Sequence, residues 1–254
     1  MIEILNRLFR SFRHEEEIYS VKDNDDTISV IDYGEERALK LNNVVYSRLN
    51  KKSIYTGSYW DYFTPLPALF NNPRILMIGL GGGTVAFQLK KIFGKKVTID
   101  IVEISRKMVE AAKYFLPVKL DKVSIIVDDG VKYIKTRHDF YDIIILDAYE
   151  GDHIPQPFFE DEFISAAHSA LKSEGVLAIN YALNLSALVY LEHYLKSLRR
   201  YFKTYTINNP FTSGNMIILC SKSMEKKDIL EKIKKKVKQT KDNKPVLVGY
   251  NDMS

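Results

Sequence analysis

The chain has 254 residues, 46% of them hydrophobic, which is enough to bury one large domain or a large domain with a small partner. Its apolar runs are as long as strands and far shorter than the roughly 20 residues that cross a bilayer, so we expect no membrane association. The N-terminal residues alternate between apolar and charged and lack the apolar core of a secretory signal, which predicts a cytoplasmic protein. The single cysteine, Cys220, excludes an intramolecular disulfide.

The net charge of +5 does not by itself predict a nucleic-acid partner, because much of the excess lies in one segment, residues 222–244. There Ile229, Leu230, Ile233 and Val237 fall on one face of an expected helix, and the lysines fall on its solvated side. No aromatic residues alternate with the lysines to stack on bases. We therefore expect no nucleic-acid partner.

The sequence pattern changes within the first third of the chain. Between residues 19 and 47, short alternating runs separated by turn signals predict a small antiparallel β element, a hairpin or a meander. From Arg74 onward, strand patterns alternate with helical patterns, which is typical of a parallel sheet built from βαβ units. The change falls within 59–72, so we assign residues 1–62 to an N-terminal segment with a small β domain, and 63–254 to a Rossmann-like α/β domain.

The second region predicts a sheet of seven strands. Five parallel strands are expected at 74–79, 97–103, 123–128, 141–147 and 175–182. A closing pair is expected at 203–208 and 215–221, and the short turn between them requires an antiparallel hairpin. Five parallel strands and a closing hairpin are the layout of transferases that use S-adenosylmethionine (AdoMet), whereas dinucleotide dehydrogenases continue with parallel strands.

The first parallel strand ends in a glycine turn, and the second ends in Glu103, which follows the last glycine by 20 residues. The glycines of the turn are Gly79, Gly81, Gly82 and Gly83. They let a ligand approach the backbone, and the helix expected from Thr84 offers free amides. Glu103 could accept both hydroxyl hydrogens of a ribose, so the pattern predicts a nucleoside site. Thr84 replaces the sixth-position glycine of the dinucleotide fingerprint.

Acidic residues also follow the third strand, in the sequence Asp128-Asp129-Gly130. Ligands of an open parallel sheet bind beyond the carboxyl ends of its strands. Asp129 could accept a hydrogen bond from an adenine amino group while the backbone beside Gly130 reads a ring nitrogen. Asp128 and Asp129 could equally cap the following helix, and the two roles can coexist.

Asp147 follows the fourth strand and is the residue that we place closest to the chemistry. It ends an apolar run, so we expect it to be partly desolvated, with the loop at 149–157 folding over it as a lid. A carboxylate in this position could orient a nucleophilic amine and accept its proton. Glu150 and Asp152 follow in the loop, either as functional groups or as ordinary loop acids.

Several motifs together resemble the spermidine synthase family, the polyamine aminopropyltransferases, and its methyltransferase-like relatives. They are RILMIGLGGG, VEIS, DDG, YDIIILDAY and IPQPFFEDEF, and the similarity extends over most of the chain. The resemblance implies that decarboxylated AdoMet lies on the glycine turn, that Glu103 holds the ribose and that Asp129 reads the adenine. Asp147 and Glu150 then match the two aspartates of the family's Asp-Ser-Ser-Asp loop, with Glu150 as the amine-activating base. The resemblance also implies a homodimer or homotetramer.

A further match concerns the acceptor. Tyr59-Trp60-Asp61 stands where the family has Tyr-His-Glu. In an aminopropyltransferase, an acidic, aromatic groove for an unusual amine would then be shaped by Asp61, Asp152, Tyr59, Tyr62 and Tyr149.

The chain departs from the family at three positions. Gly82 replaces the aspartate of GGGDGG that holds the aminopropyl end of the donor, Thr56-Gly57 replace an Asp-Glu pair that binds the polyamine, and Tyr46 replaces a glutamine. Each charge-assisted contact of this kind contributes about 1.5 to 3 kcal/mol, so its loss can change donor preference by an order of magnitude or more. Without the aspartate, the carboxylate of intact AdoMet meets less repulsion.

Three interpretations stay open at this point: an aminopropyltransferase using decarboxylated AdoMet, a methyltransferase using AdoMet, and a nucleoside-binding scaffold without catalysis. The five histidines show no ligand spacing, so we expect no metal.

Overall fold

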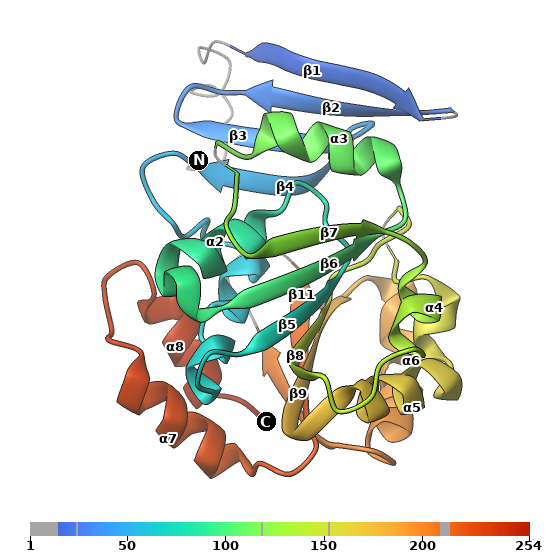
Figure 1. Cartoon of the computed structure of the whole chain (residues 1–254), viewed down its shortest axis with the longest axis vertical. Coiled ribbons are helices and arrows are strands. Elements are labelled where there is room, and N and C mark those ends of the chain that lie inside the picture. Colours follow the sequence, from blue (N-terminus) through green and yellow to red (C-terminus); the bar gives the residue numbers. More distant parts are fainter. Residues whose placement is uncertain (1–14, 24, 118, 152, 209–213) are drawn as a thin grey trace.

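A computed structural model of the chain describes residues 15–23, 25–117, 119–151, 153–208 and 214–254. The described residues form a four-stranded sheet and a seven-stranded sheet, with the smaller sheet beside one edge of the larger (Figure 1). The fold is α/β, as the sequence predicts. None of the described helices is long and apolar enough to span a bilayer.

The small sheet is an antiparallel meander in the order β1-β2-β3-β4, which confirms the β element predicted there. Its strands are β1 (Glu16–Asp23), β2 (Asp26–Asp32), β3 (Glu36–Leu41) and β4 (Val44–Asn50). One face is apolar, with Val30 and Leu39 fully buried, and it packs against Met108 and Phe115 of helix α3 (Arg106–Phe115). This helix therefore joins the small sheet to the large one.

The large sheet has the order β10-β11-β9-β8-β5-β6-β7. Its strands are β5 (Arg74–Ile78), β6 (Thr98–Glu103), β7 (Val123–Val127), β8 (Tyr141–Leu146), β9 (Leu171–Ala182), β10 (Lys203–Asn208) and β11 (Asn215–Ser221). All seven predicted strands are present, and β10 and β11 pair antiparallel as expected. Strand β9 begins four residues before its predicted start, because Leu171 pairs with Tyr141 ahead of an irregularity in the register. The turn predicted at 209–214 lies almost entirely outside the described residues.

Helices cover both faces of the large sheet, and each face buries its own apolar core. One face carries α2 (Thr84–Phe93), α7 (Lys226–Lys236) and α8 (Lys244–Asn251), and the other carries α4 (Gly130–Ile134), α5 (Asp161–Ala170) and α6 (Leu185–Leu198) (Figure 1). Short 3₁₀ helices lie at Tyr59–Phe63, Leu66–Leu69, Gly94–Lys96 and Gln156–Phe159. The first spans the expected domain boundary at residue 62, and its Trp60, Tyr62 and Phe63 belong to the core of the large sheet.

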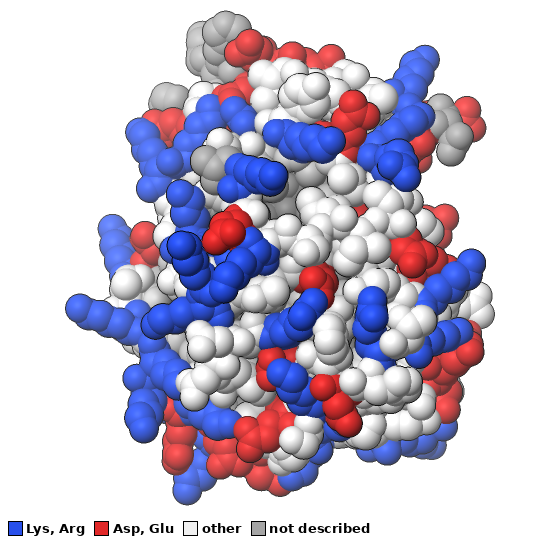
Figure 2. All heavy atoms as spheres, viewed as in Figure 1, with Lys and Arg blue, Asp and Glu red and all other residues white. Residues whose placement is uncertain are grey.

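Helix α7 has the amphipathic character predicted for the lysine-rich segment. Ile229 and Ile233 are buried, and Leu230 and Val237 pack at the edge of the same core, although the helix ends at Lys236. Lysine and arginine side chains gather along the edge of the molecule where α2 and α7 lie (Figure 2).

The order of the parallel strands reverses between β5 and β8: β6 and β7 are added on one side of β5, and β8 and β9 on the other. The two strand ends are joined directly, because the main-chain nitrogen of Asp147 donates to the carbonyl oxygen of Ile78 at 2.9 Å. Open α/β sheets bind ligands at such a reversal.

Candidate active site

A cavity of about 860 Å³ lies at this reversal, between the carboxyl ends of the parallel strands and the small sheet. Its wall includes Gly79 and Gly81 from the turn after β5, Glu103 from the end of β6, and Tyr46 and Ser47 from β4. Both sheets therefore contribute to one site.

The glycine turn contains backbone that other residues tolerate poorly. Gly79 has a φ of +95°, and a Cβ added there would lie 2.3 Å from the carbonyl oxygen of Asp147. Gly81 has a φ of +50°, and its added Cβ would lie 2.9 Å from the Ser47 hydroxyl. The turn is therefore glycine-rich partly because the Asp147 loop on one side and β4 on the other press against it.

Glu103 holds this turn in place. Its carboxylate oxygens accept hydrogen bonds from the amide of Leu80 and from the amide of Ser105, each at 2.9 Å. Burial raises the pKa of Glu103 above its ordinary value, and these amide bonds counteract part of the rise. Glu103 thus shapes the backbone of the site and also lines the cavity.

Position 82 faces the protein interior. The Gly82 amide donates to the Ser47 hydroxyl at 2.7 Å, and a Cβ added at Gly82 would lie 2.5 Å from the ring of Phe115. Phe115 is fully buried. Gly82 and Gly83, which we expected among the ligand-binding glycines, are not part of the cavity wall, whereas Gly79 and Gly81 are.

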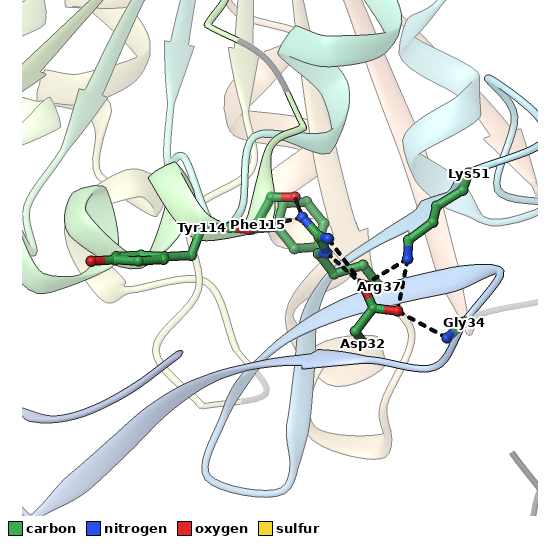
Figure 3. A network of polar contacts seen from close by, with 6 residues as sticks. All are labelled: Asp32, Gly34, Arg37, Lys51, Tyr114 and Phe115. Atoms are coloured by element: carbon green, nitrogen blue, oxygen red, sulfur yellow. Dashed lines mark hydrogen bonds and ion pairs between the residues drawn. The ribbon is translucent and has the colours of Figure 1, made fainter. Parts of the chain in front are cut away.

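A polar network fixes the end of α3 that carries Phe115 (Figure 3). The Arg37 guanidinium donates to the carbonyl oxygens of Tyr114 and Phe115 at 2.9 and 3.2 Å, and to the Asp32 carboxylate at 2.9 Å. Lys51 also pairs with Asp32, at 2.6 Å. Burial alone would raise the pKa of Asp32, but the bonds from Lys51 and Arg37 outweigh it and lower the pKa. The small sheet is thereby tied to the C-terminal end of α3.

Asp129 caps helix α4, accepting hydrogen bonds from the amides of Val131 and Lys132 at 2.8 and 3.3 Å. Asp129 and Gly130 also line the cavity, so the capping role and a ligand-binding role are compatible. Asp128 is exposed, accepts a hydrogen bond from the Asp129 amide and is not part of the wall.

Asp147 is part of the cavity wall. Its Oδ1 accepts a hydrogen bond from the side-chain amide of Asn180 at 2.8 Å, and the nearby Tyr59 hydroxyl also lowers the pKa of this carboxylate. Burial raises the pKa of Asp147 to about 6, and Asn180 and Tyr59 limit the rise because they stabilise the ionised form. The predicted partial desolvation of this carboxylate is therefore found.

The loop after Asp147 forms part of the cavity wall. Glu150 and His153 exchange main-chain hydrogen bonds, and the Tyr46 hydroxyl donates to the carbonyl oxygen of Gly151 at 3.2 Å. Tyr149 and Glu150 line the cavity, and the Tyr149 hydroxyl donates to the Asn180 carbonyl at 2.9 Å. Asp152 lies outside the described residues.

Asp61 has a different place from the one we expected. It is 3% exposed, and its carboxylate accepts hydrogen bonds from the amides of Thr56 and Gly57 and from the side chain of Gln88, at 2.9, 2.7 and 2.5 Å. It is not part of the cavity wall, whereas Tyr59 and Trp60 are. The carboxylate of Asp61 is used by the fold, because a buried charge is costly unless it is hydrogen-bonded.

The described wall of the cavity has one sign of charge. It holds six carboxylates and no lysine, arginine or histidine, in a chain with a net charge of +5. The carboxylates are those of Asp23, Asp26, Glu103, Asp129, Asp147 and Glu150. A cleft lined by one sign of charge concentrates ligands of the opposite sign, so this site is suited to cations.

Two asparagines of the wall, Asn180 and Asn215, were not predicted from the sequence. Asn180 is a polar residue inside the apolar run of β9, and that was the signal available. The described residues contain no group of three or more side chains that could hold a metal ion.

Comparisons with known proteins identify the family. The family model described as spermine/spermidine synthase domain matches residues 62–236. The polyamine aminopropyltransferase of Methanocaldococcus jannaschii is 31% identical over 68% of this chain and 60% of its own length. That of Vibrio vulnificus is 35% identical over 61% of this chain and 53% of its own length. The chain therefore spans little more than half of these relatives.

Solved structures agree on the fold. A spermidine synthase in complex with the transition-state analogue AdoDATO has a TM-score of 0.73 at 20% identity, over 92% of this chain and 84% of that one. Human methyltransferase-like protein 13, in complex with SAH, has a TM-score of 0.58 at 23% identity, over 72% of this chain and 94% of that one. With a family model that matches most of its length and a site at the expected sheet edge, the chain belongs to the spermine/spermidine synthase family.

Proposed function

We propose that this protein transfers the aminopropyl group of decarboxylated AdoMet to an amine acceptor. The observation that carries the proposal is the wall of six carboxylates without a described basic side chain. Decarboxylated AdoMet is a sulfonium with a terminal ammonium, and the acceptor is an amine, so both substrates suit this wall. The carboxylate of intact AdoMet would meet like charges there and no described cationic partner.

In this proposal the nucleoside of the donor lies across the ends of β5, β6 and β7. Gly79 and Gly81 let the ligand approach the backbone. Each carboxylate oxygen of Glu103 accepts one main-chain hydrogen bond and keeps a further lone pair for a ribose hydroxyl. Asp129, whose capping bonds use Oδ1, keeps Oδ2 for an adenine amino group.

Asp147 and Glu150 would act on the acceptor. The acceptor nitrogen attacks the propyl carbon next to the sulfonium, the carbon–sulfur bond breaks with its electron pair leaving on sulfur, and methylthioadenosine departs. The new C–N bond leaves a proton in excess, which passes to Asp147 or Glu150. With a pKa of about 6, Asp147 is mostly ionised at neutral pH and still basic enough to accept a proton.

The acceptor side of the site would be formed by Tyr59 and Tyr149, which line the same cavity as Asp147. Asp152, in the same loop as Tyr149, completes the proposed set. Asp61 is left out, because its carboxylate bonds to Thr56, Gly57 and Gln88.

Methyl transfer from intact AdoMet is the second candidate, and one observation favours it. The ring of Phe115 fills the space beside Gly82, where the family motif has an aspartate that contacts the ammonium of the donor. One attraction for the decarboxylated donor is therefore missing. A scaffold that binds nucleosides without catalysis is the third candidate.

Isothermal titration calorimetry with decarboxylated AdoMet and with AdoMet separates the three. We expect the decarboxylated donor to bind at least tenfold more tightly, and an amine panel to yield methylthioadenosine. Tight binding of AdoMet with no binding of the decarboxylated donor would replace the proposal with methyl transfer. Binding of nucleosides without turnover on any amine would favour the scaffold.

A further inference from the structure

A chain of side-chain hydrogen bonds runs from β11 through β9 and ends on Asp147, which directly follows β8. The Asn215 amide nitrogen, on β11, donates to the Asn180 amide oxygen at 2.8 Å, and the Asn180 amide nitrogen, on β9, donates to Asp147 Oδ1 at 2.8 Å. Asp147 is therefore the acceptor at the end of a relay of two amides.

Asn180 is an unusual residue for its position. It is 1% exposed within β9, where Leu177, Ala178 and Ile179 are fully buried and apolar. A buried amide is costly unless its polar atoms are hydrogen-bonded. The side chain of Asn180 meets this requirement through two partners, and both belong to the cavity wall.

The direction of the relay follows from the chemistry of the amide group. An asparagine side chain donates only from nitrogen and accepts on oxygen. Because Asn215 donates to the oxygen of Asn180, the nitrogen of Asn180 is the end that faces the carboxylate. Without Asn215, the Asn180 oxygen would lose its donor, and only the Asp147 carboxylate would fix which end of the amide faces it.

We propose that Asn180 and Asn215 are positioning residues for Asp147, and that Asn215 acts on this carboxylate through Asn180. The relay holds Asp147 in one orientation and favours its ionised form, in which it can accept a proton. The idea deepens the proposed function, on which its catalytic meaning rests, but its test needs neither substrate nor turnover.

The decisive measurement is the pKa of Asp147, followed through the ¹³C shift of its carboxyl carbon in labelled protein, with Asp147→Asn to assign the resonance. Burial has already raised this pKa to about 6, and the relay opposes the rise. Loss of the relay in Asn215→Ala should raise the pKa by about one unit. Asn180→Leu should raise it at least as much.

Asn215 is the residue to substitute because its side chain is only partly buried, so the substitution is compatible with folding. Asn215→Leu separates the relay from simple desolvation, since it adds apolar surface near Asp147 whereas Asn215→Ala admits water. A rise in both variants supports the relay. A rise in the leucine variant alone, or no rise in either, overturns it.

Asn243→Ala is the matched control. Asn243 is 5% exposed and makes comparable buried bonds, accepting from the Thr240 amide at 2.7 Å and donating to the Lys238 carbonyl at 3.0 Å, but it is not part of the cavity wall. This variant should lower the melting temperature and leave the pKa of Asp147 unchanged. An equal shift in the control would mean that the effect on Asp147 is unspecific and would also overturn the relay.

Discussion

The ring of Phe115 lies where a side chain on Gly82 would begin, with 2.5 Å between its nearest atom and an added Cβ. The aspartate of the family motif therefore cannot be restored by substitution alone. We expect Gly82→Asp to destabilise the fold by about 1 to 3 kcal/mol, as overpacking does, and not to tighten donor binding. Urea unfolding and calorimetry measure the two effects.

The double variant Gly82→Asp with Phe115→Ala provides the comparison. It removes the clash, so it should be less destabilised than the sum of the two single changes. If the losses of stability were additive, Phe115 would not restrict the size of the side chain at position 82. Tighter binding of decarboxylated AdoMet by Gly82→Asp alone would contradict the packing seen between these residues.

Asp147→Asn should abolish turnover and leave the affinity for the donor within a few-fold. The amide keeps the shape of the carboxylate but cannot accept the acceptor's proton at neutral pH. Steady-state kinetics and donor titration check the two statements separately. Unchanged turnover would remove Asp147 from the mechanism.

The pH dependence of the wild-type protein provides another test of Asp147. Because burial raises its pKa to about 6, the fraction ready to accept a proton falls as the pH drops through that value. We expect kcat/KM to decline below about pH 6. This acidic limb of the pH profile should report the protonation of Asp147. A limb that stays near the ordinary carboxyl pKa of about 4 would contradict this assignment.

The protonation of Asp147 should also affect folding stability, but there the contribution is lost as the pH rises, whereas kcat/KM declines as the pH falls. A carboxyl whose pKa is raised in the folded state binds its proton more tightly there than in the unfolded chain. Its contribution to stability is complete below about pH 4 and is lost as the pH rises through about 6. Asp147→Asn should therefore gain stability relative to wild type between pH 4 and 7, which unfolding curves across this range would reveal.

Glu103→Gln should weaken donor binding by at least tenfold. The glutamine side chain has one acceptor oxygen for two main-chain amides, those of Leu80 and Ser105, so one amide loses its partner and the glycine turn loses a support. Calorimetry with the donor measures the loss. Retention of full affinity would mean that the carboxylate neither shapes the turn nor contacts the ribose.

Arg37→Ala should lower stability by about 1 to 3 kcal/mol, because the carbonyls of Tyr114 and Phe115 and the Asp32 carboxylate all lose a donor. Lys52→Ala removes an exposed ion pair to Glu35 and is the control. Exposed pairs contribute little, so the control should unfold like wild type. Equal behaviour of the two variants would contradict a structural role for Arg37.

The strands could be predicted because their patterns are local. Each parallel strand is a short apolar run with a turn signal at its end, and the run at 141–146 leads directly to Asp147. The position of Asp61 could not be predicted in the same way. Its sequence neighbours suggested a groove residue, but its orientation depends on Gln88, 27 positions away, and on two amides of the preceding loop.

The hydrogen bond between Asn180 and Asn215 could not be predicted from the sequence for a similar reason. Asn180 and Asn215 are 35 positions apart, and they meet only because β11 pairs with β9 in one register, with Asn215 opposite Ala182. A shift of one residue in that register would turn Asn215 to the other face of the sheet. Contacts between distant strands are set by tertiary packing, which a single sequence does not encode locally.

Strand β4 contacts both ligand-facing loops of the larger sheet, through Ser47 at the glycine turn and through Tyr46 at Gly151. The larger sheet therefore cannot be treated as an autonomous catalytic module. In a chimaera that takes its small sheet from a relative, the Gly82 amide would need a new hydroxyl acceptor, and the loop after β8 a new hydrogen-bond donor. Exchange of the small sheet between family members is thus restricted at two neighbouring residues, whatever the compatibility of the remaining surface.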